Sequence, residues 1–171
     1  MADPSYYSGF YPLHLALLVV GDNPSPVAWW TPISKEPFRF LIAVDRRNYS
    51  LALLRELGEA ALHLFPWQAR HAVVRAGYRS GRNADKVSAL GLELAPAVAL
   101  QQTQIATGAT TAFELAVVQE LASDGDHAPF IFDVRHVHRG KRRPARDTPI
   151  LFLGWRDFAT LGKRWRFWPS R

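Results

Sequence analysis

The chain of 171 residues is long enough for one globular domain with a substantial core, because 48% of its residues are apolar and 12% are aromatic. The formal charge of +6 suggests an anionic partner, but the excess is confined to residues 135–171, which hold 11 basic and 2 acidic side chains. The absence of cysteine excludes disulfides, thiol nucleophiles and thiolate metal sites. No apolar run near the start approaches the ~20 residues that span a bilayer, so we expect a cytoplasmic protein without a membrane segment.

Three β-strands are predicted in the first 44 residues. Residues 15–20 form a strongly apolar run that ends at the turn formers Gly21-Asp22-Asn23-Pro24. The aromatic run 27–31 follows, and residues 38–44 form a third run of β-branched and aromatic side chains. We expect a tight turn between the first two strands and one antiparallel sheet for all three.

Short helices are predicted after this sheet. Asn48 or Ser50 can cap a helix that Gly58 ends, and its apolar residues recur at helical spacing: Leu51, Leu54 and Leu57. Further helices are predicted over residues 68–77 and 85–90.

The remaining strands are predicted from apolar and alternating runs over residues 60–64, 111–122, 129–137 and 149–153. Residues 123–126, Ser-Asp-Gly-Asp, form a good hairpin turn. Six or seven strands with only short helices favour a mainly β fold, a closed or nearly closed barrel.

Two polar segments have the composition of an anion site. Arg46-Arg47-Asn48-Tyr49-Ser50 lies between a strand and a helix start, where backbone N–H groups, a hydroxyl and two guanidinium groups suit a phosphate. In Ser80-Gly81-Arg82-Asn83-Ala84-Asp85-Lys86, glycine permits close backbone approach and two cations supply charge, without the ending of a P-loop. The alternative for each segment is an ordinary capped turn with solvated cations.

Aromatic and histidine side chains give weaker signals. Trp29 and Trp30 would face opposite sides of a strand, so that one borders a planar ligand or an oligomer interface. His136 and His138 have a metal-compatible spacing, but no third ligand is placed, which favours solvent-facing histidines. His127 follows the predicted hairpin turn and could point into a site. No hydrolase motif is present, so we predict no catalytic side chain and no metal, and a cofactor would carry any reaction.

The basic C-terminal region has the composition of a nucleic-acid patch. Residues 139–146 are strongly basic, and aromatic and basic side chains then alternate over residues 163–168. A solvated loop, followed by aromatic residues docked on the chain's own body or on a sister subunit, is the favoured alternative.

The order of these motifs resembles the flavin reductase-like family of FMN-binding split barrels, from about Tyr11 to Gly154. The strongest part is residues 27–54, VAWWTPISKEPFRFLIAVDRRNYSLALL. The second is residues 80–87, SGRNADKV, and the third is Gly125-Asp126-His127 at the start of a strand. The resemblance implies an FMN-binding split β-barrel over residues 1–154, a homodimer with FMN near the subunit interface, and a basic aromatic tail over residues 155–171.

The resemblance also implies site residues. The flavin ring and ribityl chain would contact Ala28, Trp29, Trp30, Thr31 and Ser34. The phosphate would be held by Arg46, Arg47 and Ser50, and the second loop would complete the site with Ser80, Gly81, Arg82 and Lys86. His127 would lie where a nicotinamide can approach the ring.

The implied function is an NAD(P)H-dependent flavin reductase, in which FMN accepts a hydride and passes electrons to free flavin or to a partner. The alternative is a tightly FMN-bound electron-transfer module that lacks NAD(P)H activity and docks an acidic partner protein through its basic tail. A nucleic-acid-binding barrel is the least favoured hypothesis, because residues 1–134 carry a net negative charge.

Overall fold

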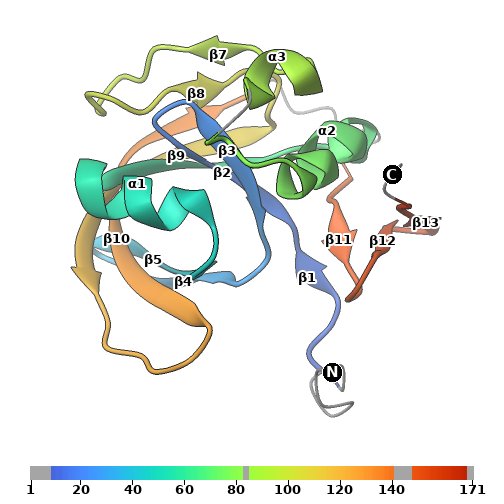
Figure 1. Ribbon diagram of the computed structural model, residues 1–171, viewed down its shortest axis with the longest axis horizontal. Helices are drawn as coiled ribbons and strands as arrows, with labels where there is room; N and C mark the ends of the chain where they lie inside the picture. Colours follow the sequence, from blue (N-terminus) through green and yellow to red (C-terminus); the bar gives the residue numbers. More distant parts are fainter. Residues whose placement is uncertain (1–8, 83–84, 141–147, 169–171) are drawn as a thin grey trace.

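The computed structural model describes residues 9–82, 85–140 and 148–168 (Figure 1). Its centre is a curled, seven-stranded antiparallel sheet in the order β3-β2-β6-β9-β10-β5-β4. The bounds of its strands are β2 (Ala16–Val20), β3 (Asn23–Val27), β4 (Trp30–Lys35), β5 (Phe38–Asp45), β6 (Glu59–Leu64), β9 (Thr111–Glu120) and β10 (His127–Arg139).

The two edges of this sheet are consecutive in the chain. β3 and β4 lie at opposite ends of the strand order, yet only Ala28 and Trp29 separate them. So short a connection can join the two edges only if the sheet curls until they approach each other. The expected nearly closed barrel is therefore confirmed, with its opening at the link between β3 and β4.

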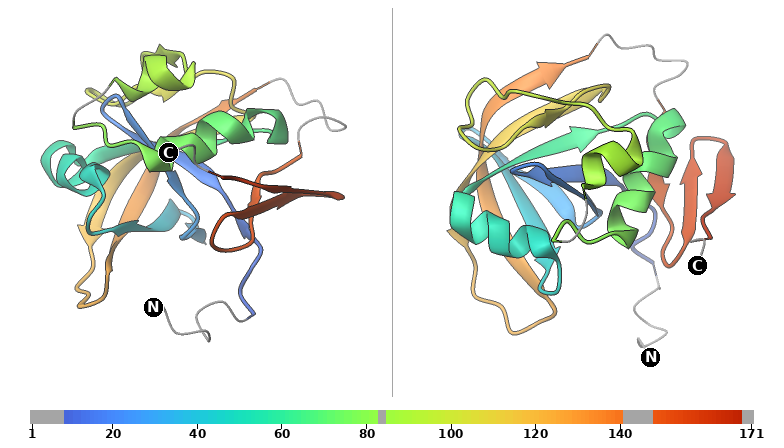
Figure 2. Two further views of the ribbon diagram at one scale, coloured as in Figure 1. Left: turned by 45° about the vertical axis from the view of Figure 1, so that its right-hand side comes forward. Right: turned by 45° about the horizontal axis from the view of Figure 1, so that its top comes forward.

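A smaller sheet stands beside the barrel (Figure 2). Its strands run in the order β1-β11-β12-β13, with bounds β1 (Leu13–His14), β11 (Leu151–Phe152), β12 (Asp157–Thr160) and β13 (Lys163–Arg166). The described part of the C-terminal region thus pairs with the body of the chain, and Phe158 and Phe167 are buried there. A separate functional role for residues 155–171 stays a prediction. A third, two-stranded sheet joins β7 (Leu94–Ala95) and β8 (Ile105–Ala106).

Short helices occupy the connections, as expected. α1 (Tyr49–Leu57) begins at Asn48, whose side chain accepts a hydrogen bond from Ser50 N, and ends at Gly58 in the left-handed conformation. The predicted helix over residues 68–77 is divided into η2 (Trp67–Ala69), α2 (Arg70–Arg75) and η3 (Ala76–Tyr78). α3 (Lys86–Leu90) is capped by Asp85. No helix in the described part of the chain is long and apolar enough to cross a bilayer.

The apolar run in β2 contributes to two cores. Leu18 and Val20 point into the barrel, whereas Leu17 and Val19 pack on its other side against α2 and the smaller sheet. Successive side chains of a strand face opposite sides, so a strand buried on both faces must be apolar throughout.

The prediction of one strand over residues 27–31 is wrong, because Val27 ends β3 and Trp30 begins β4. Asn23 and Pro24 belong to β3, because Gly21, with a φ of 63°, and Asp22 suffice for the turn that pairs Val20 with Asn23. Proline is tolerated because β3 is an edge strand. The predicted strand over residues 149–153 shortens to β11, and β12 and β13 were not predicted.

His138 binds a buried carboxylate. Its Nε2 lies 2.6 Å from Oε1 of Glu114, which also accepts hydrogen bonds from the backbone N–H groups of Val98 and Ala99. Burial alone would raise the pKa of Glu114, but these donors hold the pKa below its usual value. The described residues contain no group of three or more side chains arranged to bind a metal.

We predict that Glu114→Gln lowers the free energy of unfolding by roughly 2–4 kcal/mol, because the charged acceptor of three hydrogen bonds is lost. Chemical denaturation at pH 7 measures this difference. Since the pKa of the folded carboxyl is lowered, its contribution should be present above the unfolded-state value and disappear as the pH falls through the folded value. Glu120→Gln, which removes an exposed ion pair with Arg55, should change stability by less than about 1 kcal/mol. Equal losses in both variants would contradict the prediction.

Candidate functional site

Two cavities meet at the opening of the barrel. The larger has a volume of about 570 Å³ and the smaller about 510 Å³, each within the range of about 300–1,000 Å³ usual for small-molecule sites. They share part of their lining: Ser25, Asp45, Arg47, Asn48, Gly77 and Tyr78. One elongated ligand can therefore occupy both.

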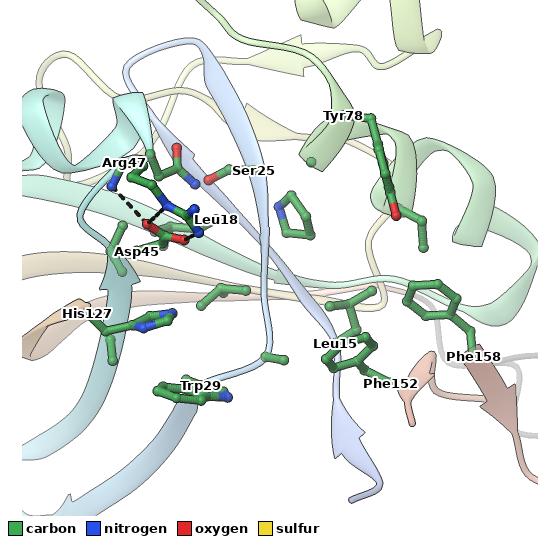
Figure 3. A pocket seen from close by; sticks show the side chains of 18 of the residues that line it. Leu15, Leu18, Ser25, Trp29, Asp45, Arg47, Tyr78, His127, Phe152 and Phe158 are labelled. Carbon is green, nitrogen blue, oxygen red and sulfur yellow. Dashed lines mark hydrogen bonds and ion pairs between the residues drawn. The ribbon is translucent and has the colours of Figure 1, made fainter. Parts of the chain in front are cut away.

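The end of β5 and the start of α1 form a polar wall of the larger cavity (Figure 3). Asp45 accepts hydrogen bonds from Nε and Nη2 of Arg47, at 3.1 and 2.8 Å. These bonds hold the pKa of Asp45 below its usual value. An arginine side chain has five N–H donors, so Arg47 keeps donors for a ligand while Asp45 fixes its orientation.

Trp29 and His127 form a stacked pair on the same cavity. Their ring centroids lie 4.2 Å apart, with an angle of 25° between the rings. Nδ1 of His127 lies 2.8 Å from Oδ1 of Asp126, and the backbone oxygen of Trp29 accepts a hydrogen bond from Ala43 N. Asp126 thus holds the His127 ring at the start of β10, and Ala43 holds the backbone of Trp29 at the link between β3 and β4.

Arg46 supports this wall from outside the cavities. Its Nε donates to Gly125 O and its Nη2 to Ser123 O, while its backbone N–H donates to Asp126 O. The side chain is therefore engaged in holding the hairpin turn before His127, and it lines neither cavity.

Lys86 lines the smaller cavity and has no counter-ion among the described residues. The residue is 5% exposed, and burial lowers the pKa of its ammonium group to about 8. A buried charge without a partner is costly, so this position favours an anion in the cavity.

The floor beneath this position is closely packed. A side chain at Gly81 would place its Cβ 2.1 Å from Oδ1 of Asn23, so only glycine fits there. Ser50 is completely buried, with its hydroxyl 2.8 Å from both Asn23 Nδ2 and Ser25 Oγ. Ser50 therefore lies behind the cavity wall and supports the residues that face the ligand.

The predicted site residues fall into two groups. Those that line the two cavities are Ala28, Trp29, Arg47, Ser80, Gly81, Lys86 and His127. Arg82 lies beside them, with its guanidinium carbon 5.3 Å from the ring centre of Tyr49. Those that line neither cavity are Trp30, Thr31, Ser34, Arg46, Ser50 and Arg82. Trp30 and Thr31 border one apolar groove, and Trp30 and Ser34 border another.

Sequence reasoning missed the far wall of the larger cavity. Tyr78, Phe152, Trp155 and Phe158 line it, from η3, from β11, from the turn after β11 and from β12. No sequence signal places residues 152–158 opposite residues 45–47, because their proximity depends on how the smaller sheet packs. Asp45 carried a weak signal, since a carboxylate two residues before an arginine can bind it.

A family model described as a flavin reductase like domain matches residues 9–161. The chain belongs to this family. It is 29% identical over 133 residues to an uncharacterised protein of Archaeoglobus fulgidus, covering 76% of this chain and 74% of that one. An FMN-binding protein from Thermus thermophilus is similar in structure, with a TM-score of 0.80, 23% identity, and coverage of 94% and 92% of the two chains. An NADH:FAD oxidoreductase from Streptomyces globisporus has a TM-score of 0.74 at 19% identity, covering 99% and 98%. These structures establish the split-barrel fold.

The residues present fit FMN. A phosphate would supply the counter-ion that the described residues do not give Lys86, and the stacked Trp29 and His127 offer an aromatic surface to a planar ring. The joined cavities provide space between these two features.

We predict that Lys86→Met weakens FMN binding about tenfold to a hundredfold, because one charge-assisted contact to the phosphate is lost. Riboflavin, which lacks the phosphate, should bind within about twofold of the unaltered protein. Titration calorimetry measures both affinities. Lys35→Met, which alters an exposed lysine on β4, should change neither affinity. A similar loss for riboflavin would contradict a phosphate contact.

FMN affinity should depend on pH through the same lysine. Below pH 8 the ammonium is largely protonated and ready for the phosphate, whereas above about 8 binding requires uptake of a proton. We therefore expect the affinity to fall by up to about tenfold per pH unit above that value. Riboflavin affinity should stay constant between pH 6.5 and pH 9 on the same titration. An FMN affinity that is flat over this range would contradict the prediction.

Proposed function

We propose that the chain is an NAD(P)H-dependent flavin reductase that binds FMN across the two joined cavities. The observation that carries the proposal is Lys86, a buried cation without a counter-ion in the described part of the chain, in a cavity that continues to the stacked rings of Trp29 and His127. The similarity to an FMN-binding protein and to an NADH:FAD oxidoreductase supports the cofactor and the electron donor.

At the phosphate end, the chain supplies charge and fixed backbone. Lys86 provides the positive charge, and the backbone of Gly81, which packs closely on Asn23, lines the same cavity. Arg47 contributes its remaining donors from the other side of the shared lining. Its ion pair with Asp45 restricts its motion, so less side-chain entropy is lost when the ligand binds.

At the ring end, the chain orients the reactants. Ala28 and Trp29 border the larger cavity, and His127 is held by Asp126 on one ring nitrogen while the other remains for a hydrogen bond to a ligand. When bound, FMN supplies the hydride chemistry, because it can take up a hydride from a nicotinamide. No nucleophile is required of the protein, whose contribution is position and polarity.

We also propose a homodimer. β4 is an edge strand, and apolar side chains on and beside it are exposed, including Ile33 at 47% and Phe38 at 37%. An exposed apolar edge favours association. Ile33→Asp should convert a dimer to a monomer in sedimentation analysis, and a chain that is already monomeric at micromolar concentration would contradict this.

An electron-transfer module that docks an acidic partner is the second candidate. It is favoured by Trp168, which is 66% exposed and has the guanidinium carbons of Arg156 and Arg166 at 5.9 and 5.7 Å from its ring centre. An exposed aromatic ring close to arginines is typical of a protein interface. On this alternative, a nicotinamide would leave bound FMN oxidised.

We predict that NADH or NADPH bleaches the visible flavin absorption of the FMN-loaded protein under anaerobic conditions. His127→Leu should lower the second-order rate of bleaching roughly tenfold, about 1.4 kcal/mol, because the ring that faces the cavity is lost. His136→Leu, a matched change further along β10, should leave the rate unchanged. Bound flavin that stays oxidised with both nucleotides would contradict the reductase and favour the second candidate.

A further inference from the structure

The smaller cavity is lined by two segments that carry positive charge. Asn48 and Tyr49, at the start of α1, form one part of its lining, and residues 79–81 with Lys86 form another part between η3 and α3. The N-terminus of a helix has a partial positive charge, and each cationic side chain adds a full one. Arg79 stands directly before the motif of residues 80–87 and is not one of the predicted site residues.

The charges around this cavity do not balance. Its charged lining consists of Asp45, Arg47, Arg79 and Lys86. Asp45 accepts two hydrogen bonds from the Arg47 guanidinium group, so these two charges largely compensate each other. Neither Arg79 nor Lys86 has a side-chain hydrogen bond or an ion pair with another described residue. Two positive charges therefore remain without a counter-ion in the described part of the chain.

The neighbouring arginines are engaged elsewhere. The Arg46 guanidinium group donates to two backbone oxygens of the hairpin turn, and that of Arg82 lies over the ring of Tyr49. Neither residue lines the smaller cavity. Arg79 does line it, from an exposed position with an extended backbone that follows η3. An exposed arginine alone is usually solvated, so the argument depends on the cavity that Arg79 shares with the buried Lys86.

Two unpaired cations match a particular form of phosphate. A phosphate monoester carries close to two negative charges at neutral pH, because its second pKa is about 6. A phosphodiester carries one charge, and riboflavin has no phosphate. Arginine presents its N–H donors in a planar fork that can bind two phosphate oxygens at once, whereas lysine acts as a point charge. Arg79 and Lys86 together can therefore neutralise a dianion.

We propose that Arg79, together with Lys86, makes the smaller cavity selective for the dianion of a phosphate monoester. The proposal rests on the proposed function in one respect, since the monoester is taken to be FMN. Arg79 is then the residue that distinguishes FMN from riboflavin and from a flavin whose phosphate is esterified twice.

The first test compares FMN with its phosphate monomethyl ester, which carries one negative charge, by titration calorimetry at pH 7.5. The unaltered protein should bind FMN about tenfold more tightly than the ester. Arg79→Met should bind FMN about tenfold more weakly and prefer it to the ester by about threefold or less, because one of the two cations is lost. Arg79→Lys keeps the charge and should retain most of the preference.

The second test is a pH profile between pH 5 and pH 7. The charged groups of the lining keep their charge over this range, because the pKa of Asp45 lies below its usual value and that of Lys86 is about 8. The other titratable side chains of the lining are the phenols of Tyr49 and Tyr78, and a phenol is neutral here. The second ionisation of the FMN phosphate is therefore the titration that changes the charge in this cavity.

The FMN affinity of the unaltered protein should rise about tenfold from pH 5 to pH 7, as the dianion replaces the monoanion. In Arg79→Met the rise should shrink to about threefold or less. Riboflavin reports any titration of His127 at the ring end, and its affinity should stay constant in both proteins. The methyl ester, which has no second ionisation, should also give a flat profile.

Arg75→Met is the matched control. Arg75 is an exposed arginine at the end of α2, and it does not line the smaller cavity. This variant should bind all three flavins as the unaltered protein does. Equal losses of FMN affinity at both positions would indicate a general effect of surface charge and overturn the proposal. A loss in Arg79→Met that is the same for FMN, the ester and riboflavin would assign Arg79 a structural role and also overturn it.

Failure of this proposal is distinguishable from failure of the proposed function. If the unaltered protein binds FMN and its methyl ester equally, dianion selectivity fails and the proposed function stands. If it binds neither FMN nor riboflavin, the proposed function fails, and phenyl phosphate at millimolar concentration then tests the anion site alone by NMR titration. Weaker binding of phenyl phosphate in Arg79→Met than in Arg75→Met would support the dianion site, and equal binding in the two variants would overturn it.

Discussion

The architecture depends on one short connection. Ala28 and Trp29 join the two edge strands of a seven-stranded sheet, so the sheet can satisfy its connectivity only by curling into an open barrel. The same two residues border the larger cavity, and Ala43 N donates a hydrogen bond to Trp29 O, which extends the pairing of β4 with β5 to the link itself. The constraint that closes the barrel therefore also fixes the aromatic wall of the site.

The buried charged side chains differ in whether the described residues provide them with partners. Glu59 accepts backbone hydrogen bonds from Gln101, Gln102 and Thr103, and Glu114 is satisfied in the same way by a neighbouring part of that loop. These carboxylates fasten a connection to the barrel. Lys86 differs from them, because the described residues offer its ammonium group no ion pair. A buried cation that the described residues leave unpaired is therefore the candidate for binding an anionic ligand.

Local signals in the sequence predicted the local structure well. Asn48 and Gly58 cap α1 as expected, and the alternation in residues 129–137 matches β10. The prediction went wrong at Asn23 and Pro24, where residues typical of turns belong to an edge strand. An edge position is a property of the whole sheet and cannot be recognised from neighbouring residues.

The site was predictable only where its residues belong to local motifs. The motif resemblance brought Trp29, Arg47 and Lys86 to one site, and the two cavities do join them. It did not reveal that Asp45 holds Arg47, or that Ser50 is buried behind the wall. The far wall of the larger cavity arises from packing of Tyr78 beside residues 152–158, more than 70 residues away in the chain, for which the sequence contains no local signal.

A crystal structure of the protein with FMN would locate both ends of the ligand. We predict electron density for the phosphate within hydrogen-bond distance of Lys86 Nζ and for the ring in the larger cavity beside Ala28 and Trp29. Density for FMN in the apolar groove along β4, or a phosphate that is solvated away from Lys86, would contradict FMN binding across the two cavities.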